Sequence, residues 1–336
     1  YELIVSDLNN PWSFVFLSEK SILITEKEGK LIHFKNGIKT TINELPEIVD
    51  LGQGGLLDIE LHPNYKENGW IYITYASSND DKNGANTSLM RFKISGNTIT
   101  NKELLYSATP NSKKGQHFGS RIVFDDNNDL YFSIGDRGNR NVNPQNIKRD
   151  GGKIYRLYDD GSIPIDNPFV KDRYAKKAIY SYGHRNPQGI AINPLSNEIW
   201  IHEHGPRGGD EINIISPGKN YGWPLASYGV NYIGTKFTDN TTIEGMEDPI
   251  HYWVPSIAPS GMVFVTSDLY PKLKNNLLIG SLKFEYLHLC VIDGNSVIKE
   301  EKLFEGIGRV RSLEIGPKGY VYAGVENLGI IKILPN

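Results

Sequence analysis

The sequence predicts an all-β protein, a six-bladed β-propeller of four-stranded antiparallel sheets. Aromatic residues make up 11% of its 336 residues and glycine occurs 34 times, a composition that favours short strands joined by tight turns. No amphipathic helical pattern of any length interrupts the strand-like segments. A strand–turn–strand unit recurs six times along the chain, and such a repeat is typical of a radial array of antiparallel sheets.

Each of the six units has an alternating apolar strand, a turn of Gly, Asn, Asp, Pro, Ser or Lys, and a second strand rich in aromatic or β-branched residues. A two-sheet sandwich would also contain many strands, but it would not repeat the same pair six times. The predicted pairs, in chain order, are Ser13–Leu17 with Ile22–Thr25, Leu57–Leu61 with Trp70–Tyr75, Ile122–Phe124 with Leu130–Ile134, Ile190–Ile192 with Ile199–His202, Met262–Val265 with Leu277–Gly280, and Leu313–Ile315 with Tyr320–Ala323.

A further strand follows most of these pairs and extends the blade outward. Clear examples are Lys30–Phe34, Leu89–Ile94, Lys153–Leu157 and Ile330–Leu334. The opening segment Tyr1–Val5 is a strand without a pair of its own. We predict that it joins the blade of the C-terminal strand Gly329–Leu334, because this pairing would close the ring and remove a free edge.

No linker or shift in composition divides the chain, so residues 1–336 are predicted to form one propeller domain. Two polar segments, Ser77–Thr87 and Lys236–Glu247, are predicted to be exposed loops.

Composition also excludes several classes of function. A formal net charge of −3 argues against a nucleic-acid-binding protein that depends on a broad basic surface. Cys290 is the only cysteine, so neither an internal disulfide nor a thiolate metal cluster can form. No run of 18 apolar residues is present, so no membrane span is predicted. Strand-like sequence starts at Tyr1, and we therefore expect a mature periplasmic or secreted chain whose export signal has been removed.

The stretch 183–224 is the most distinctive part of the sequence, because it combines charges, turn formers and aromatic residues. Arg185 and Asn186 stand in a turn before a short strand, and the loop 203–211 after the next strand is rich in carboxylates and glycine. Functional loops typically lie at the ends of rigid strands. In a propeller the ends of the inner strands converge at one mouth of the central channel, so we expect the site there.

Four basic residues stand near predicted strand ends, namely Arg185, Lys283, Arg309 and Arg311; Arg309 and Arg311 alternate on one strand, so both side chains point to the same face. At one channel mouth they would repel each other unless an anion lay between them. Since Arg binds carboxylates in bidentate fashion, a small ligand with several carboxylates would fit. The alternative is that each side chain pairs with a nearby Asp or Glu on the surface.

His117 is the histidine best placed to act as a general base, because glycines flank it and a predicted inner strand follows it. Gln53 has the matching position in another blade. A single histidine is more often structural than catalytic, and this alternative stays open at the level of sequence.

Two kinds of metal site are conceivable in the loop after His202. The imidazoles of His202 and His204 share one strand face, but a zinc or copper site normally needs a third imidazole or a cysteine. Oxygen donors are more abundant, and hard oxygen ligands in a bent loop favour calcium. These donors are the carbonyls of Gly205 and Pro206 and the carboxylates of Asp210 and Glu211. The alternative is a simple turn with its carbonyls facing water.

The chain also resembles a known family, the soluble quinoprotein glucose dehydrogenases and aldose sugar dehydrogenases of the glucose/sorbosone dehydrogenase type. The resemblance lies in segments that occur in the family's order over most of the chain. These segments are GQGGLLDIELHP, QHFGSRIVF with SIGDRG, GGKIYRLYDDGSIPIDNPF, YGHRNPQGIAINP, HEHGPRGGDEINIISPGKNYGWP, WVPSIAPSGMVF, GSLKF and RVRSLEIGPKG.

The resemblance implies a six-bladed propeller that binds pyrroloquinoline quinone (PQQ) and calcium. It implies oxidation of an aldose at C1 to the aldonolactone, with His117 as the base, hydride transfer to PQQ and electron transfer to an external acceptor. We also expect a monomer. The quinone ligands implied are Gln53, Arg185, Asn186, Ser256, Lys283, Arg309 and Arg311. The calcium ligands implied are the carbonyls of Gly205 and Pro206 at the catalytic ion, and Glu211 with the Tyr221 carbonyl at a structural ion.

The sequence departs from the glucose dehydrogenase branch in two positions. Gln116 stands where that branch has an acidic residue, and Asn141 stands where it has Gln. That branch's long insertions are missing too, so the resemblance is greater to the aldose sugar dehydrogenases, with a broad range of aldoses.

Two other functions are possible for a propeller with this sequence. A calcium-dependent lactonase or other hydrolase on a propeller would hold calcium through carboxylates and Asn, and it gives the cations no role. A non-catalytic propeller that binds a protein or a glycan predicts loss of the base or of the cations.

Overall fold

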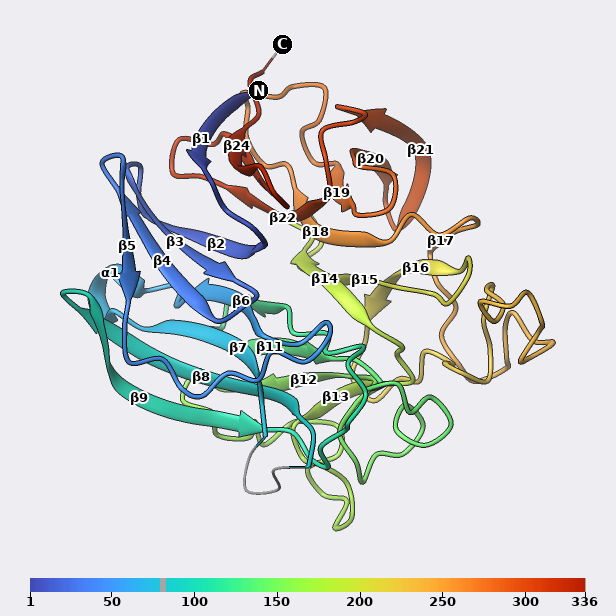
Figure 1. Cartoon of the computed structure of the whole chain (residues 1–336). Helices are drawn as coiled ribbons and strands as arrows, with labels where there is room; N and C mark the ends of the chain where they lie inside the picture. Colours follow the sequence, from blue (N-terminus) through green and yellow to red (C-terminus); the bar gives the residue numbers. More distant parts are fainter. Residues whose placement is uncertain (79–82, 336) are drawn as a thin grey trace.

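The computed structural model describes residues 1–78 and 83–335, which form six four-stranded antiparallel sheets arranged around a centre (Figure 1). The predicted six-bladed β-propeller is confirmed. All six predicted strand pairs are hydrogen-bonded neighbours in six separate sheets.

The first three blades follow each other along the chain. Their strands are β2 (Pro11–Ser18), β3 (Ser21–Glu26), β4 (Lys30–Lys35) and β5 (Ile38–Ile42); β6 (Leu56–Leu61), β7 (Ile71–Ser77), β8 (Asn86–Ser95) and β9 (Thr98–Ser107); and β10 (Ile122–Phe124), β11 (Leu130–Ile134), β12 (Lys153–Leu157) and β13 (Ile179–Tyr182).

The second half of the chain forms the other three blades. Their strands are β14 (Pro187–Ile192), β15 (Ile199–Glu203), β16 (Asp210–Ile215) and β17 (His251–Trp253); β18 (Pro259–Phe264), β19 (Leu277–Ser281), β20 (Tyr286–Asp293) and β21 (Ser296–Leu303); and β22 (Val310–Ile315), β23 (Val321–Val325) and β24 (Gly329–Lys332) with β1 (Glu2–Ser6).

The first strand of each blade lies nearest the centre. β2, β6, β10, β14, β18 and β22 contact one another in a closed ring, so their ends surround the central channel. β1 is the outermost strand of the last blade, where Glu2 faces Lys332 and Ser6 faces Gly329 in antiparallel register with β24. The first strand and the last three strands therefore form one sheet.

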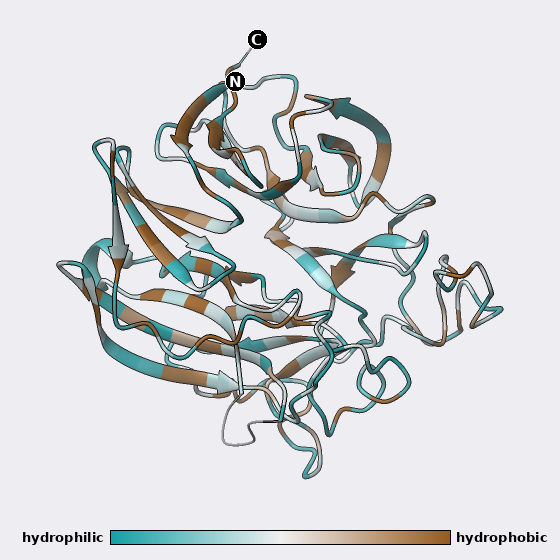
Figure 2. Ribbon diagram, viewed as in Figure 1, coloured by the Kyte–Doolittle hydropathy of each residue, from teal (hydrophilic) through white to brown (hydrophobic). Residues whose placement is uncertain are grey.

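The core lies between neighbouring blades, because each sheet buries apolar side chains on both faces, as expected when sheet packs on sheet. Val15 of β2 and Leu56 of β6 belong to one buried cluster, while Trp200 of β15 meets Phe264 of β18 edge to face at 5.4 Å. Figure 2 shows apolar residues alternating with polar ones along the strands. Burial of one large apolar side chain stabilises the fold by roughly 1.5–3 kcal/mol, so these contacts lock adjacent blades together.

The prediction for the loop Ser77–Thr87 was wrong at both ends. β7 continues to Ser77 and β8 begins at Asn86, and the side chains of Asn86 and Thr87 are buried. Residues 79–82 of that segment lie outside the described residues. Lys236–Glu247 contains no strand and is largely exposed, as predicted.

The one helix in the described ranges, α1 (Tyr65–Asn68), is a single turn that ends at Gly69 in the left-handed conformation. No helix among residues 1–78 and 83–335 is long and apolar enough to cross a membrane.

Candidate active site

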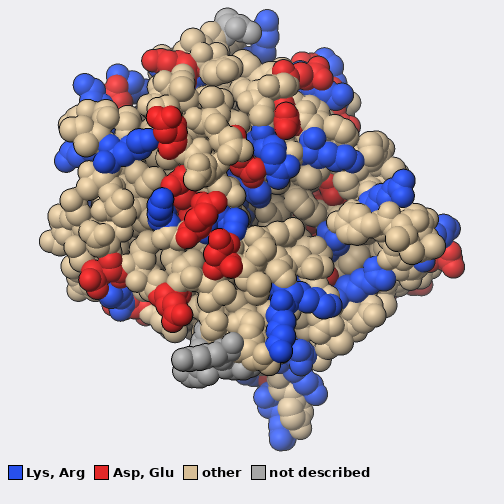
Figure 3. Space-filling view, in the orientation of Figure 1, with Lys and Arg blue, Asp and Glu red and all other residues tan. Residues whose placement is uncertain are grey.

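Two adjoining cavities lie at one mouth of the central channel, as the convergence of inner strands predicts. The larger has a volume of about 1140 Å³ and is lined by residues from all six blades. The smaller has a volume of about 330 Å³ and shares Pro206 and Tyr232 with the larger cavity. In the space-filling view, basic side chains gather around the central hollow of the molecule with acidic ones beside them (Figure 3).

Most of the residues predicted from the sequence to form a site meet in these cavities. The larger cavity is lined by Gln53, Asn186, Gly205, Pro206, Ser256, Lys283, Arg309 and Arg311. His117 and Arg185 line the smaller cavity instead. Glu211 and Tyr221 border a third space of only about 10 Å³ on the far side of Gly205.

The four predicted cations are not all equivalent. Arg309 and Arg311 both bind Glu326, through Nε–Oε2 and Nη2–Oε1 distances of 2.6 and 2.8 Å. Although burial acts to raise it, the charges of the two arginines lower the pKa of Glu326. Arg309 and Arg311 therefore fit both interpretations of the sequence, because they pair with an acid and also line a cavity that could hold a ligand.

The larger cavity keeps an excess of positive charge despite Glu326. Five basic side chains line it, while Asp210 and Glu326 are the acidic ones. Lys27 pairs with Asp50 at 2.5 Å, and Asp50 is not part of the lining. Lys283 forms no ion pair within the described part of the chain. An anionic ligand would relieve the repulsion among these groups.

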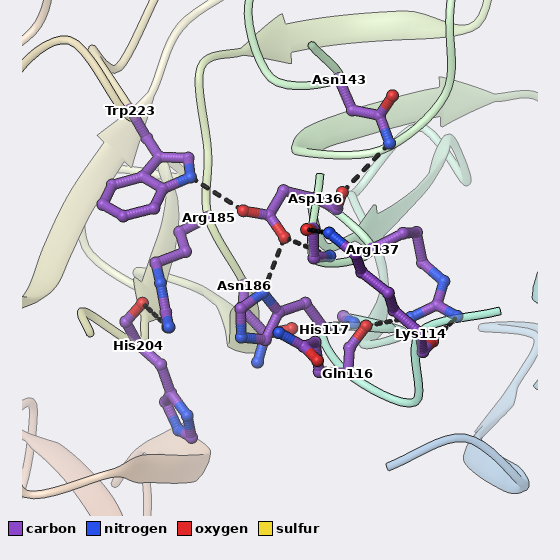
Figure 4. Close-up of polar contacts among 12 residues, drawn as sticks. Lys114, Gln116, His117, Asp136, Arg137, Asn143, Arg185, Asn186, His204 and Trp223 are labelled. Carbon is purple, nitrogen blue, oxygen red and sulfur yellow. Dashed lines mark hydrogen bonds and ion pairs between the residues drawn. The ribbon is translucent and has the colours of Figure 1, made fainter. Parts of the chain in front are cut away.

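Arg185 differs from the expectation that it joins the other cations. Its Nη1 donates to the carbonyl of His204 at 2.8 Å, and its guanidinium lies 5.4 Å from the centre of the Trp223 ring. These contacts turn the side chain toward the smaller cavity, where His117 also lies (Figure 4).

The carboxylate of Asp136 holds the His117 ring, and the indole of Trp223 holds that carboxylate. Its Nδ1 lies 2.6 Å from Oδ1 of Asp136, and Oδ2 of Asp136 accepts a hydrogen bond of 2.9 Å from Nε1 of Trp223 (Figure 4). The amide of Gly138 also donates to Oδ1 at 2.7 Å. Because a carboxylate accepts the Nδ1 proton, Nε2 of His117 is left with a free lone pair.

The electrostatics keep this imidazole neutral. Burial lowers the pKa of His117 from its ordinary value of 6.5, and the nearby positive charge of Arg185 lowers it further. The pKa of Asp136 is also lowered; burial, the largest single effect, acts to raise it, but the hydrogen bonds from His117 and Trp223 and the nearby positive charges together outweigh burial. A neutral imidazole beside an ionised carboxylate is the resting state that a general base requires.

The backbone of His117 is in the left-handed region, with φ of 59°, which is uncommon for a residue with a side chain. Oε1 of Gln53 accepts the His117 amide proton at 2.8 Å and fixes this conformation. Arg137 supports the same segment from behind, because its guanidinium stacks 3.3 Å from the centre of the Phe118 ring and donates to the carbonyl of Gln116. His117 is thus held in place by its main chain as well as its side chain.

His202 and His204 have structural partners. His202 Nε2 contacts the carbonyl oxygen of Ser260, and His204 Nε2 lies 2.6 Å from that of Pro259. Burial lowers the pKa of His204 to about 3. Both imidazoles link β15 to β18, which argues against the zinc or copper alternative.

Gly205 and Pro206 line the larger cavity, and their carbonyls are candidate oxygen ligands for a cation. Asp210 shapes their loop, because its carboxylate accepts hydrogen bonds from the Gly205 amide, the Ser256 hydroxyl and the Ala258 amide at 2.8–2.9 Å. Neither carbonyl accepts a hydrogen bond from any residue that the structure describes. Buried carbonyls without a donor are suited to a hard cation.

Residues 8–332 of the chain match the Glucose / Sorbosone dehydrogenase family. The chain belongs to this family. It is 39% identical to the aldose sugar dehydrogenase YliI of Escherichia coli (strain K12), over 99% of this chain and 92% of that protein. Membership of the family makes this protein a sugar-oxidising oxidoreductase.

Two solved structures of aldose sugar dehydrogenases share its fold. The apo-form from Escherichia coli has a TM-score of 0.94 at 37% identity, and the match covers 100% of this chain and 99% of that one. The PQQ-bound form from Streptomyces coelicolor has a TM-score of 0.80 at 27% identity, with coverage of 98% and 95%.

Three residues that contact the candidate site residues were not predicted from the sequence, namely Asp136, Glu326 and Trp223. Asp136 and Glu326 each follow the second strand of a hairpin, β11 and β23, while His117 and Arg309 stand just before the first strand. An antiparallel pair brings those two positions to the same end of the blade, and this is the signal that could have found them. Trp223 gave no such signal, because a long loop carries it to Asp136.

Proposed function

We propose that the protein oxidises aldose sugars at C1 to aldonolactones with PQQ and calcium as cofactors, and passes the electrons to an external acceptor. One observation carries this proposal: a neutral, firmly held His117 opens on a cavity next to one that has an excess of positive charge.

The chemistry of the larger cavity suits PQQ, which carries three carboxylates. Lys283, Arg309 and Arg311 would bind them, and Gln53, Asn186 and Ser256 would supply neutral hydrogen bonds. Arg185 would reach the same ligand from the wall between the two cavities.

Calcium would bind at the Gly205 and Pro206 carbonyls, which lack donors within the described chain. A second, structural ion would lie between Glu211 and the Tyr221 carbonyl, where Glu203 is close enough for its charge to act on Glu211. Burial and that charge raise the pKa of Glu211 well above its ordinary value, and a cation would relieve both effects. No cluster of three or more His, Cys, Asp or Glu side chains suited to a metal occurs in the described ranges, so main-chain oxygens must complete either site.

When bound, PQQ would supply a hydride acceptor and calcium would supply a Lewis acid. The protein's own part is acid–base and positional. Nε2 of His117 would remove the proton from the anomeric hydroxyl while the hydride leaves C1. Asp136 would stabilise the resulting imidazolium and hold the ring through Nδ1, and Trp223 would hold Asp136.

The test is reconstitution of the protein with PQQ and Ca²⁺, followed by absorbance spectra before and after addition of an aldose. We expect the spectrum of the bound quinone to change to that of the reduced form and an artificial dye to be reduced in proportion to the sugar. Failure to turn over any aldose would remove the proposed reaction.

His117→Gln provides the matched variant for the base. The expected fall in kcat is roughly 10²-fold or more, the usual contribution of a general base, with PQQ still bound. Undiminished turnover in this variant would mean that another group removes the proton.

A further inference from the structure

The smaller cavity contains basic side chains that the proposed mechanism does not use. Lys114 and Arg140 line it together with Arg185, while Asp136 is the only acidic residue of its lining. The carboxylate of Asp136 is fully engaged by His117, Trp223 and the Gly138 amide. Positive charge in this cavity is therefore not neutralised by the lining itself.

Within the described residues, Lys114 and Arg140 also lack acidic partners outside the cavity. Lys114 Nζ contacts the carbonyl of Gly138, and Arg140 Nη1 donates to Oδ1 of Asn231 at 2.9 Å. Arg140 is also held over the ring of Phe237, 4.6 Å from its centre. Neither cation has an Asp or Glu within 4.0 Å in residues 1–78 and 83–335, so two positioned cations meet only neutral oxygens.

These cations lie within reach of a sugar whose C1 is at His117. Lys114 precedes His117 by three residues, so their Cα atoms are at most about 11 Å apart. Between them Gln116 lines the cavity, and Asn141 lines it near Arg140. Amides suit the hydroxyls in the middle of a sugar, and the cations suit a negative group at the end remote from C1.

We propose that the preferred substrates are anionic aldoses, which carry a carboxylate or a phosphate remote from C1 and bind it through Lys114 and Arg140. This inference rests on the proposed function and leaves the reaction at C1 unchanged. One hydride leaves C1 for the quinone, one proton leaves the anomeric hydroxyl for His117, and the C1–O bond of the lactone becomes double. The external acceptor then takes the two electrons.

The experiment compares kcat/KM of the holoenzyme for glucose, glucuronic acid and glucose 6-phosphate at low and at raised salt. We expect at least one anionic sugar to exceed glucose by about tenfold at low salt, the equivalent of ~1.4 kcal/mol. Added salt should reduce this preference because the cations are partly exposed. A carboxylate preference and a phosphate preference are told apart by which of the two sugars leads.

Arg140→Gln and Lys114→Gln should each lower the ratio of the anionic sugar to glucose, and the double variant should abolish the preference. Arg173→Gln is the matched control, since Arg173 also stacks on an aromatic ring, 4.5 Å from the centre of Tyr174, but lines neither cavity. Binding of glucuronate to the protein without PQQ, measured by calorimetry, should be tighter than that of glucose and should weaken in the double variant.

A ratio at or below one in the unmodified enzyme, or a preference that survives in the double variant, would overturn this inference alone. Absence of turnover with glucose and all other neutral and anionic aldoses would overturn the proposed function. Calorimetry separates the two cases, because it detects the anion site whether or not a sugar is oxidised.

Discussion

Asp136→Asn is the substitution that most directly tests how His117 is prepared. The carboxylate accepts three hydrogen bonds, from His117 Nδ1 and the Gly138 amide at Oδ1 and from Trp223 Nε1 at Oδ2. An asparagine side chain has one oxygen and one NH₂ group, so it cannot accept on both sides.

Each orientation of the new amide loses something specific. With its oxygen toward His117, the NH₂ group faces the Trp223 N–H, and two donors meet. With its NH₂ group toward His117, the amide donates to Nδ1 and places the ring proton on Nε2, where the base should be free. One buried group is left without a partner in either case, which costs about 1–3 kcal/mol of stability.

We expect kcat of Asp136→Asn to fall by roughly 10²–10⁴-fold, because the wrong tautomer dominates or the imidazolium loses its counter-charge. The assay is dye reduction by the reconstituted enzyme across pH. The acid limb should also move to lower pH, since the charge of Asp136 acts to raise the pKa of His117.

Asp150→Asn is the control, because Asp150 is another fully buried aspartate and lines neither cavity. It accepts from the Tyr106 hydroxyl at 2.6 Å and the Thr109 amide at 2.7 Å, so its variant should lose stability without a change in kcat. A folded Asp136→Asn protein with the kcat and pH profile of the unmodified enzyme would refute the role assigned to this carboxylate.

Four further outcomes are expected. For the unmodified enzyme, kcat/KM should be retained down to pH values below 6.5 and fall as His117 is protonated, because its pKa is lowered; an acid limb above 6.5 would contradict this. Lys283→Ala should weaken PQQ about tenfold in an absorbance titration, with little effect on the KM for sugar, and Lys274→Ala should not. Glu314→Gln should raise Tm near pH 9 more than near pH 5: burial raises the pKa of Glu314 from 4.5 to about 8, so its ionisation costs stability as pH rises from the ordinary value to about 8 and the loss is complete above it. Ca²⁺ should raise Tm more than Mg²⁺ does, and Glu211→Gln should reduce that difference.

The repeat of strand pairs made the fold predictable, because strands such as Ile122–Phe124 and Leu130–Ile134 are apolar in both the sequence and the blade. The convergence of Lys283, Arg309 and Arg311 was also predictable, since the two arginines stand at the start of the inner strand β22 and Lys283 follows β19, the hairpin partner of the inner strand β18. The pairing of Arg309 and Arg311 with Glu326 was not, because that acid lies 15 residues or more along the chain from both arginines and only hairpin register brings it close. Register is set by packing across the whole sheet.

Trp223 shows the other limit of the sequence. It reaches Asp136 from a loop 87 residues away, and no local pattern predicts where such a loop returns. The predicted ends of the loop Ser77–Thr87 were wrong for a different reason, which is local. Ser, Asn and Thr are polar enough to predict a loop, yet the side chains of Asn86 and Thr87 are buried and donate to the carbonyls of Pro110 and Phe118, in the segment between β9 and β10.

The contact between Gln53 and His117 constrains how this dehydrogenase can be altered. Gln53 lines the larger cavity, and its side-chain oxygen also holds the main chain of His117. A replacement chosen to change what the larger cavity accepts would therefore also disturb the position of His117, and with it the proton removal that we propose. Lys114, Arg140 and Asn141 line the smaller cavity without hydrogen-bonding to His117. Substitutions at these positions, in evolution or in the laboratory, can therefore change which sugar binds without moving His117.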